Sequence, residues 1–215
     1  MIDTQMWNAF SQAYAFFGNS LLSPMSKTSD AGLDPDFWRA FPDFSDEGVV
    51  AAVDGALSFA EEAQRKSAQG GNAVQDVSVE YTHLFVGPSP AAAPWETMYR
   101  GVSGSETSAG FGQATYEMRA LLRAAGLELR NENNQYEDHI GIELLYLSEL
   151  CRRRSCDDSD ATASDAAVFS FIETHPLAWI GALRDAVELE CFDGYLRHIL
   201  GVAEALLRRH AKLLV

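Results

Sequence analysis

Apolar residues recur at helical spacing along almost the whole chain. In the first segment they follow an i, i+4, i+7, i+8, i+11 pattern, which places side chains on one face of a helix. These positions are Met6, Phe10, Ala13, Tyr14 and Phe17. The pattern stops at Gly18, where we expect this helix to end.

Residues that favour helix ends mark the next three elements. Asp34 followed by Pro35 is typical of an N-cap and the first helical position. Ser45, with two acidic residues after it, is expected to begin a longer helix. A further helix over residues 73–86 would be stopped by the pair that begins at Gly87.

The second part of the chain shows the same periodicity. Its expected helices cover 113–125, Asn134 to about Arg154, 166–174, 176–190 and 192–214. Asn134 with Glu137 three residues later has the spacing of a capping box. Pro176 forces a break after His175, because the residue before a proline avoids the helical region.

Residues 87–112 lie between these two sets of helices and are rich in proline, alanine, serine and glycine. A loop of this length inside a compact domain is often functional. The sequence has no convincing strand pattern and no internal repeat. We therefore predict an all-α fold, a single helical domain of about nine to eleven helices. Its halves, 1–86 and 113–215, would be joined by this Pro/Gly-rich loop.

The composition of the chain limits the kinds of molecule that we expect it to bind. The chain has 215 residues, is 47% hydrophobic and carries a net charge of −15, which disfavours nucleic acid and anionic membranes and favours a cationic partner. Its three cysteines form no C-x-x-C pair, as expected in a reducing compartment. The start of the chain lacks the pattern of a signal peptide, and no membrane-spanning run is evident, so we expect a cytoplasmic protein.

One enzymatic hypothesis follows from side-chain spacing. His139 and Glu143 stand four residues apart, which can place two metal ligands side by side, with His83 or His175 as a third ligand. This set would suit a metal-assisted hydrolase. The sequence has no nucleophile motif and no glycine-rich phosphate loop, so no cofactor is expected, although a guanine nucleotide stays open as a ligand.

The same residues also have a structural interpretation. Asp138 would fall in the first turn of a helix, where the helix dipole favours a carboxylate. His139 could satisfy a backbone group near the same helix end. Leu84, Phe85 and Trp95 could simply pack in the core.

Three motifs in order carry a resemblance to a known family. They are Tyr81-x-x-Leu84-Phe85-Val86-Gly87-Pro88 with Pro94-Trp95-Glu96-Thr97-Met98-Tyr99 after it, Glu137-Asp138-His139-Ile140 with Glu143-Leu144, and Phe171-x-x-x-His175-Pro176-Leu177-x-Trp179. Together they resemble the TorD/DmsD family of cytoplasmic redox-enzyme maturation chaperones. The resemblance covers roughly residues 77–207.

The resemblance implies an all-helical protein that is not an enzyme. It would bind the twin-arginine signal peptide of a molybdopterin-containing oxidoreductase subunit and delay export until the cofactor is loaded. The implied binding positions are Tyr81, Leu84, Phe85, Gly87, Pro88, Asp138 and His139, with Trp95 and Tyr99 in the matching loop. Ser89 stands where some members carry an aromatic residue, which leaves the client subunit open.

The chemistry of the motif residues agrees with this implication. A twin-arginine leader offers two guanidinium groups and an apolar stretch. Asp138 could accept a guanidinium fork, with Glu137 or Glu143 in support. Leu84, Phe85 and Trp95 would receive the apolar part. An alternative is an assembly factor that binds the mature part of a reductase. The sequence leaves open a monomer or a domain-swapped dimer, and a peripheral contact with the export machinery.

Overall fold

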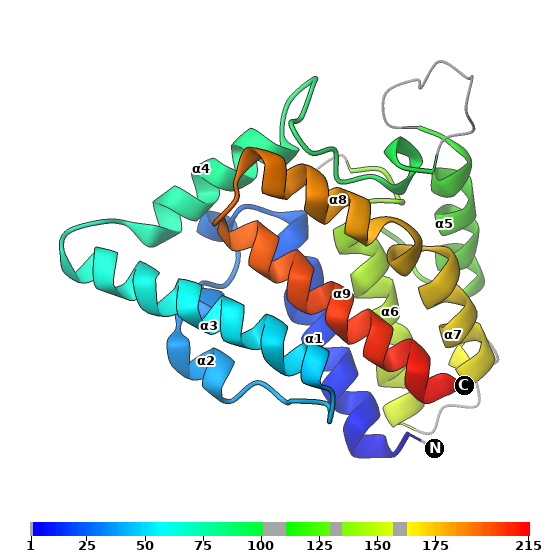
Figure 1. Cartoon of the computed structure of the whole chain (residues 1–215). Helices are drawn as coiled ribbons and strands as arrows, with labels where there is room; N and C mark the ends of the chain where they lie inside the picture. Colours follow the sequence, from blue (N-terminus) through cyan, green and yellow to red (C-terminus); the bar gives the residue numbers. More distant parts are fainter. Residues whose placement is uncertain (1, 101–110, 130–134, 157–162) are drawn as a thin grey trace.

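The computed structural model describes residues 2–100, 111–129, 135–156 and 163–215. Within these ranges the chain forms nine α-helices, three short 3-10 turns and no strand, which confirms the all-α prediction (Figure 1). The helices are α1 (Thr4–Leu22), α2 (Pro35–Arg39), α3 (Glu47–Ala68), α4 (Ala73–Phe85), α5 (Gln113–Ala124), α6 (Ile140–Ser155), α7 (Asp165–Thr174), α8 (Pro176–Glu190) and α9 (Tyr195–Leu214). The 3-10 turns are η1 (Met25–Lys27), η2 (Ala31–Leu33) and η3 (Glu96–Met98). The division into two halves stays a prediction.

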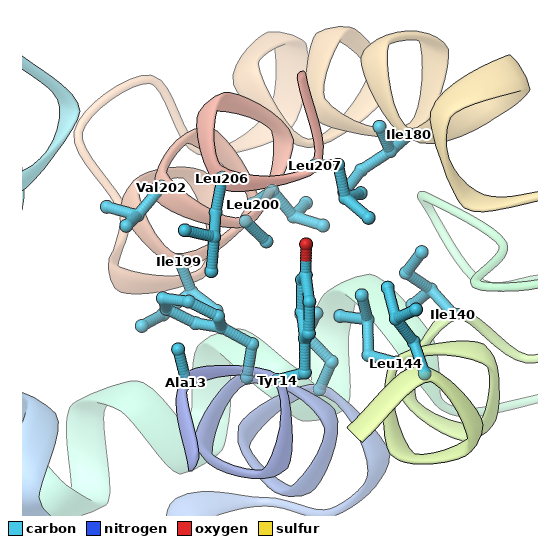
Figure 2. Packing of buried hydrophobic residues seen from close by; sticks show 14 of the residues in the cluster. Ala13, Tyr14, Ile140, Leu144, Ile180, Ile199, Leu200, Val202, Leu206 and Leu207 are labelled. Carbon is cyan, nitrogen blue, oxygen red and sulfur yellow. The ribbon is translucent and has the colours of Figure 1, made fainter. Parts of the chain in front are cut away.

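The core lies where α9 crosses α1 and α6 (Figure 1). Figure 2 shows apolar side chains of these three helices and of α8 pointing toward one another around Tyr14. The ring of Tyr14 is fully buried, and its hydroxyl lies 3.2 Å from Nδ1 of His210 on α9. The apolar stripe predicted for the first helix is thus the face that α1 turns toward the core.

The prediction that the first helix ends at Gly18 is wrong, because α1 continues to Leu22. Gly18 is buried against α6, and a Cβ added there would lie 2.9 Å from the carbonyl oxygen of Gly141. A Cβ added at Gly141 would in turn lie 2.7 Å from the carbonyl oxygen of Gly18. The two glycines let the helix backbones approach closely, so the glycine in α1 serves packing and not termination.

Most of the predicted helix ends are confirmed. Asp34 accepts a hydrogen bond from the amide of Asp36 at 2.9 Å and begins α2. Asp46 caps α3. Gly87 after α4 and Gly126 after α5 have φ of 117° and 67°, a left-handed conformation that favours glycine.

The predicted start of the sixth helix is wrong. α6 begins at Ile140, and His139 is its N-cap, with Nδ1 accepting a hydrogen bond from the amide of Gly141 at 3.0 Å. Asp138 therefore lies before the helix and not in its first turn. Asn134 lies outside the described residues, as do residues 101–110 of the loop and residues 157–162.

One stretch of the described chain, Asp165–Glu190, is long and apolar enough to cross a membrane by length and composition alone, although no such span was expected. In the structure this stretch is two helices, because α7 ends at Thr174 and α8 begins with Pro176. The predicted break at His175 is thus confirmed. Trp179 and Ile180 of α8 are buried in the core, and core helices of folded domains pass the same test.

Candidate functional site

The two sequence patches that carry the resemblance meet in space. The segment after α4 runs antiparallel to the residues that precede α6, with a single β-bridge between Trp95 and His139. The amide of Glu96 donates to the carbonyl of Asp138, and the amide of Ile140 donates to the carbonyl of Pro94, both at 3.0 Å. This pairing fixes residues 94–96 against the start of α6 and explains why the helix begins later than its capping pattern suggests.

Asp138 is the centre of the junction and is fully buried. Its Oδ2 accepts hydrogen bonds from the amide of Thr97 at 3.0 Å and from the Thr97 hydroxyl at 2.6 Å. Its Oδ1 accepts from the hydroxyl of Thr115 on α5 at 3.0 Å. Burial raises the pKa of Asp138, and these three hydrogen bonds offset that effect only in part. Asp138 thus ties the loop, α5 and α6 together.

A second buried polar group lies beside it. Glu96 has its Oε2 2.9 Å from Nδ1 of His175 and also forms an ion pair with Arg100. Glu143 of α6 accepts a hydrogen bond from the indole N–H of Trp179 at 3.1 Å. Ligand atoms of Glu96, Glu143 and His175 all lie within 4.8 Å of one another.

The two carboxyl groups of this cluster have opposite pKa shifts. Burial, then the charge of Glu96, raises the pKa of Glu143 well above its usual range. Burial would also raise the pKa of Glu96, but the hydrogen bond and charge of His175 and the hydrogen bond from Arg100 outweigh it and lower that pKa. These opposite shifts favour the neutral form of Glu143 beside the carboxylate of Glu96.

His139 is not part of that cluster. Its Nδ1 accepts from the amide of Gly141, so the neutral ring carries its proton on Nε2, which is buried and has no hydrogen-bond partner among the described residues. Burial lowers the pKa of His139 to about 3. The indole N–H of Trp95 is likewise buried and unpartnered within the part of the chain that the structure describes.

The predicted metal set of His139, Glu143 and a further histidine is therefore wrong. Among the described residues, the cluster that could hold a metal uses Glu96 and His175 with Glu143. His83 is exposed on α4, where it lies 3.4 Å from Glu190. The cation of Arg100 and the ring of His175 already engage Glu96, so the cluster is balanced by its own side chains.

The other predicted peptide-binding positions divide into three groups by their exposure to solvent. Tyr81, Leu84 and Phe85 are at most 3% exposed, which confirms the core-packing interpretation for the latter two and contradicts an open cleft lined by them. Gly87 and Pro88 are exposed. Trp95 and Tyr99 are half-buried, and the ring of Tyr99 stacks on Trp179 with centroids 5.3 Å apart. Direct contact of these residues with a ligand stays a prediction.

An open groove lies elsewhere, between α3, α4 and the turn from α8 to α9. It has a volume of about 970 Å³, which is in the range of ligand sites. Phe59 and Ala63 of α3 and Val77 of α4 lie against it, and two strongly exposed apolar side chains line it, Val79 at 57% and Phe192 at 71%. Figure 1 shows α3 and α4 diverging from the body of the protein at this place.

The sequence contains a faint signal for this groove. α4 has its core face at Val77, Tyr81 and Leu84, yet Val79 lies off that face. An apolar residue on the outer face of a helix is common by itself, so the periodicity of α4 did not identify a site. Sequence reasoning also missed Thr97 and Thr115, because hydroxyl partners of a carboxylate have no spacing rule.

Comparison with known proteins places the chain in a class. Residues 45–185 match the family described as Nitrate reductase delta subunit, and the chain belongs to that family. This confirms the resemblance drawn from the motifs, which lie largely inside the matched range.

Curated relatives give the more particular likeness. The chain is 27% identical over 126 residues to the chaperone protein TorD of Vibrio cholerae serotype O1, covering 56% of this chain and 54% of the relative. It is 25% identical over 114 residues to the chaperone protein TorD of Photobacterium profundum, covering 52% of this chain and 51% of the relative. The chain thus spans about half the length of the curated relatives it matches.

Proposed function

We propose that this protein is a cytoplasmic, non-catalytic chaperone that binds the twin-arginine leader of a molybdopterin-containing oxidoreductase subunit and assists its maturation before export. The observation that carries the proposal is the family match over residues 45–185. The TorD chaperones among its relatives support the same class.

The charge and surface of the protein support this choice of ligand. A net charge of −15 attracts a cationic peptide and repels nucleic acid. The groove between α3 and α4 offers exposed apolar side chains, and Asp193, which is 84% exposed in its side chain, lines the same groove. An apolar stretch that follows two arginines is the complementary ligand.

The buried motif residues have a supporting role in this proposal. Asp138 and Glu96 hold the loop after α4 against α5, α6 and the start of α8. Exposed Gly87 and Pro88, with half-buried Trp95 and Tyr99, are the motif residues that a bound peptide could reach without opening the core.

Calorimetric titration with a synthetic twin-arginine leader tests the proposal. We expect saturable binding, and binding that is weakened at least about fivefold when both arginines are replaced by lysine, because a bidentate guanidinium fork is lost. Equal binding of the two peptides, or no binding of either, would contradict the proposal. Pull-down of a leader-deleted client separates this function from an assembly factor that recognises the mature part.

A further inference from the structure

The groove beside α3 and α4 has the length of a short helical peptide. On α3 its lining runs from Gly55 to Lys66, and on α4 from Ala73 to His83. At 1.5 Å per residue these walls are about 15–17 Å long, which matches a helix of about ten residues. The apolar stretch of an export leader has about 7–15 residues.

Apolar side chains of both helices line the groove among charged ones such as Glu62 and Asp76. Phe59 and Ala63, four residues apart, present one face of α3, and Val77 presents the facing side of α4. Val79 and Phe192 project into solvent at the rim. Covering Val79 and Phe192 with an apolar helix removes their exposed area from water, which is the main favourable term in such recognition.

The charges around the groove differ between its two ends. At the tip of the α3–α4 pair, Arg65 and Lys66 both pair with Glu62, and Asp76 balances the remaining charge. The end at the α8–α9 turn is acidic on balance, because Asp193 lines it and Glu190 lies beside His83. The guanidinium of Arg197 lies over the ring of Phe192, 5.3 Å from its centroid, and pairs with Glu188.

The two exposed carboxylates of this acidic end have only weak partners. Asp193 lies 3.5 Å from His198, and Glu190 lies 3.4 Å from His83. Glu80 adds a third carboxylate, which accepts from the amides of Tyr195 and Leu196 at the start of α9. A peptide with a cationic end and an apolar stretch is therefore complementary to the groove in one direction only.

We infer that this groove binds the apolar stretch of the leader as a helix of about ten residues, with the two arginines at the α8–α9 end beside Glu190 and Asp193. The inference rests on the proposed function, and it adds the place and the direction of binding. It locates the apolar contact away from the buried motif residues.

Titration of a fluorescein-labelled synthetic leader, an Arg-Arg pair followed by an apolar stretch, tests the location. We expect Val79→Glu and Phe192→Glu each to weaken binding at least about tenfold, because a charge is placed where an apolar contact forms. Val50→Glu is the matched control, since Val50 is 42% exposed on α3 but does not line this groove. Its affinity should equal that of the wild type, and circular dichroism should show that all three variants are folded.

A fourth variant tests whether the leader binds beside α5 instead of in the groove. Tyr116 on α5 is 55% exposed and packs edge-on against Phe111. If Tyr116→Glu abolishes binding while Val79→Glu and Phe192→Glu bind normally, the inference is overturned and the proposed function stands. Failure of the wild type to bind overturns the function itself. If Val79→Glu instead dissociates a dimer seen by light scattering and leaves leader binding unchanged, the groove is a self-association surface and the inference is wrong.

A charge variant tests the direction. Replacing Glu190 with Gln and Asp193 with Asn should weaken binding of the Arg-Arg leader at least about fivefold, because both guanidinium groups lose their carboxylate partners. The same double variant should bind a Gln-Gln leader as the wild type does. An unchanged affinity for the Arg-Arg leader would overturn the assigned direction.

Discussion

Substitution of Asp138 separates its structural role from a role in ligand binding. Asp138→Ala leaves three donors without their acceptor, namely the amide and hydroxyl of Thr97 and the hydroxyl of Thr115. Each unmet buried donor costs about 1–3 kcal/mol, and removal of the buried carboxyl recovers part of that, since its raised pKa shows that desolvation outweighs the hydrogen bonds. We expect a loss of about 2–4 kcal/mol in the free energy of unfolding.

Asp138→Asn should behave differently. The amide oxygen can accept from both groups of Thr97, while the amide N–H can donate to the hydroxyl of Thr115, so every hydrogen bond has a counterpart. The expected loss is below about 1 kcal/mol. Asp138→Asn also removes the negative charge, and it should bind the leader as the wild type does if the carboxylate is structural.

Urea unfolding followed by circular dichroism measures these losses. Asp185→Ala is the matched control, because Asp185 is exposed and its contact with Arg184 is 3.4 Å long; its effect should stay within about 0.5 kcal/mol. Equal stability of Asp138→Ala and wild type would refute the structural account. A folded Asp138→Asn variant that no longer binds the leader would show that the carboxylate contacts the arginines directly.

Three further predictions concern packing and protonation. Gly141→Ala should destabilise the protein by about 1–3 kcal/mol through its clash with α1. Gly201→Ala, with open space around it, should stabilise the protein by about 0.5–1 kcal/mol in urea titrations. Changes of the same sign in the free energy of unfolding would contradict the close crossing of α1 and α6. The pKa of His139 and of His210 is lowered to about 3, so the unfolded state binds more protons below pH 6.5 and each histidine costs about 2 kcal/mol of stability between pH 6.5 and about 5. His210→Gln should therefore lose about that much less on acidification, and an unchanged pH profile would count against its burial as a neutral ring. Glu143 has a raised pKa, so folding takes up a proton above pH 4.5 and the stability of the protein falls as pH rises. Glu143→Gln should therefore be more stable than the wild type at pH 8 in thermal unfolding. A lower melting temperature of the variant at that pH would refute a neutral Glu143 carboxyl.

The fold could be predicted because helix formation leaves local signals. Asp34 and Gly87 act through groups within a few residues, and the structure shows each in its expected role. The predicted end of the first helix at Gly18 was wrong because the packing partner of this glycine, Gly141, is distant in sequence. Nothing near Gly18 in the sequence distinguishes a glycine that packs against another helix from one that ends its own helix. The start of α6 was misplaced for a similar reason, since His139 pairs with Trp95 in the loop.

The candidate site could be predicted only in part. The motifs indicated correctly that the segment around Trp95 meets the segment around Asp138. They did not indicate that Asp138 is buried, because its burial depends on how α5 and the other helices pack over it. The groove beside Val79 depends on the angle between two helices, which periodicity does not determine.

Photocrosslinking of the bound leader tests the central claim most directly. A synthetic twin-arginine leader with one photoreactive residue in the middle of its apolar stretch would be irradiated with the protein and the product mapped by mass spectrometry. The account predicts crosslinks to the groove faces of α3 and α4, within 55–66 and 73–83. Crosslinks confined to the surface around Met98, Phe111 and Tyr116, or none that an unlabelled leader can compete away, would contradict it.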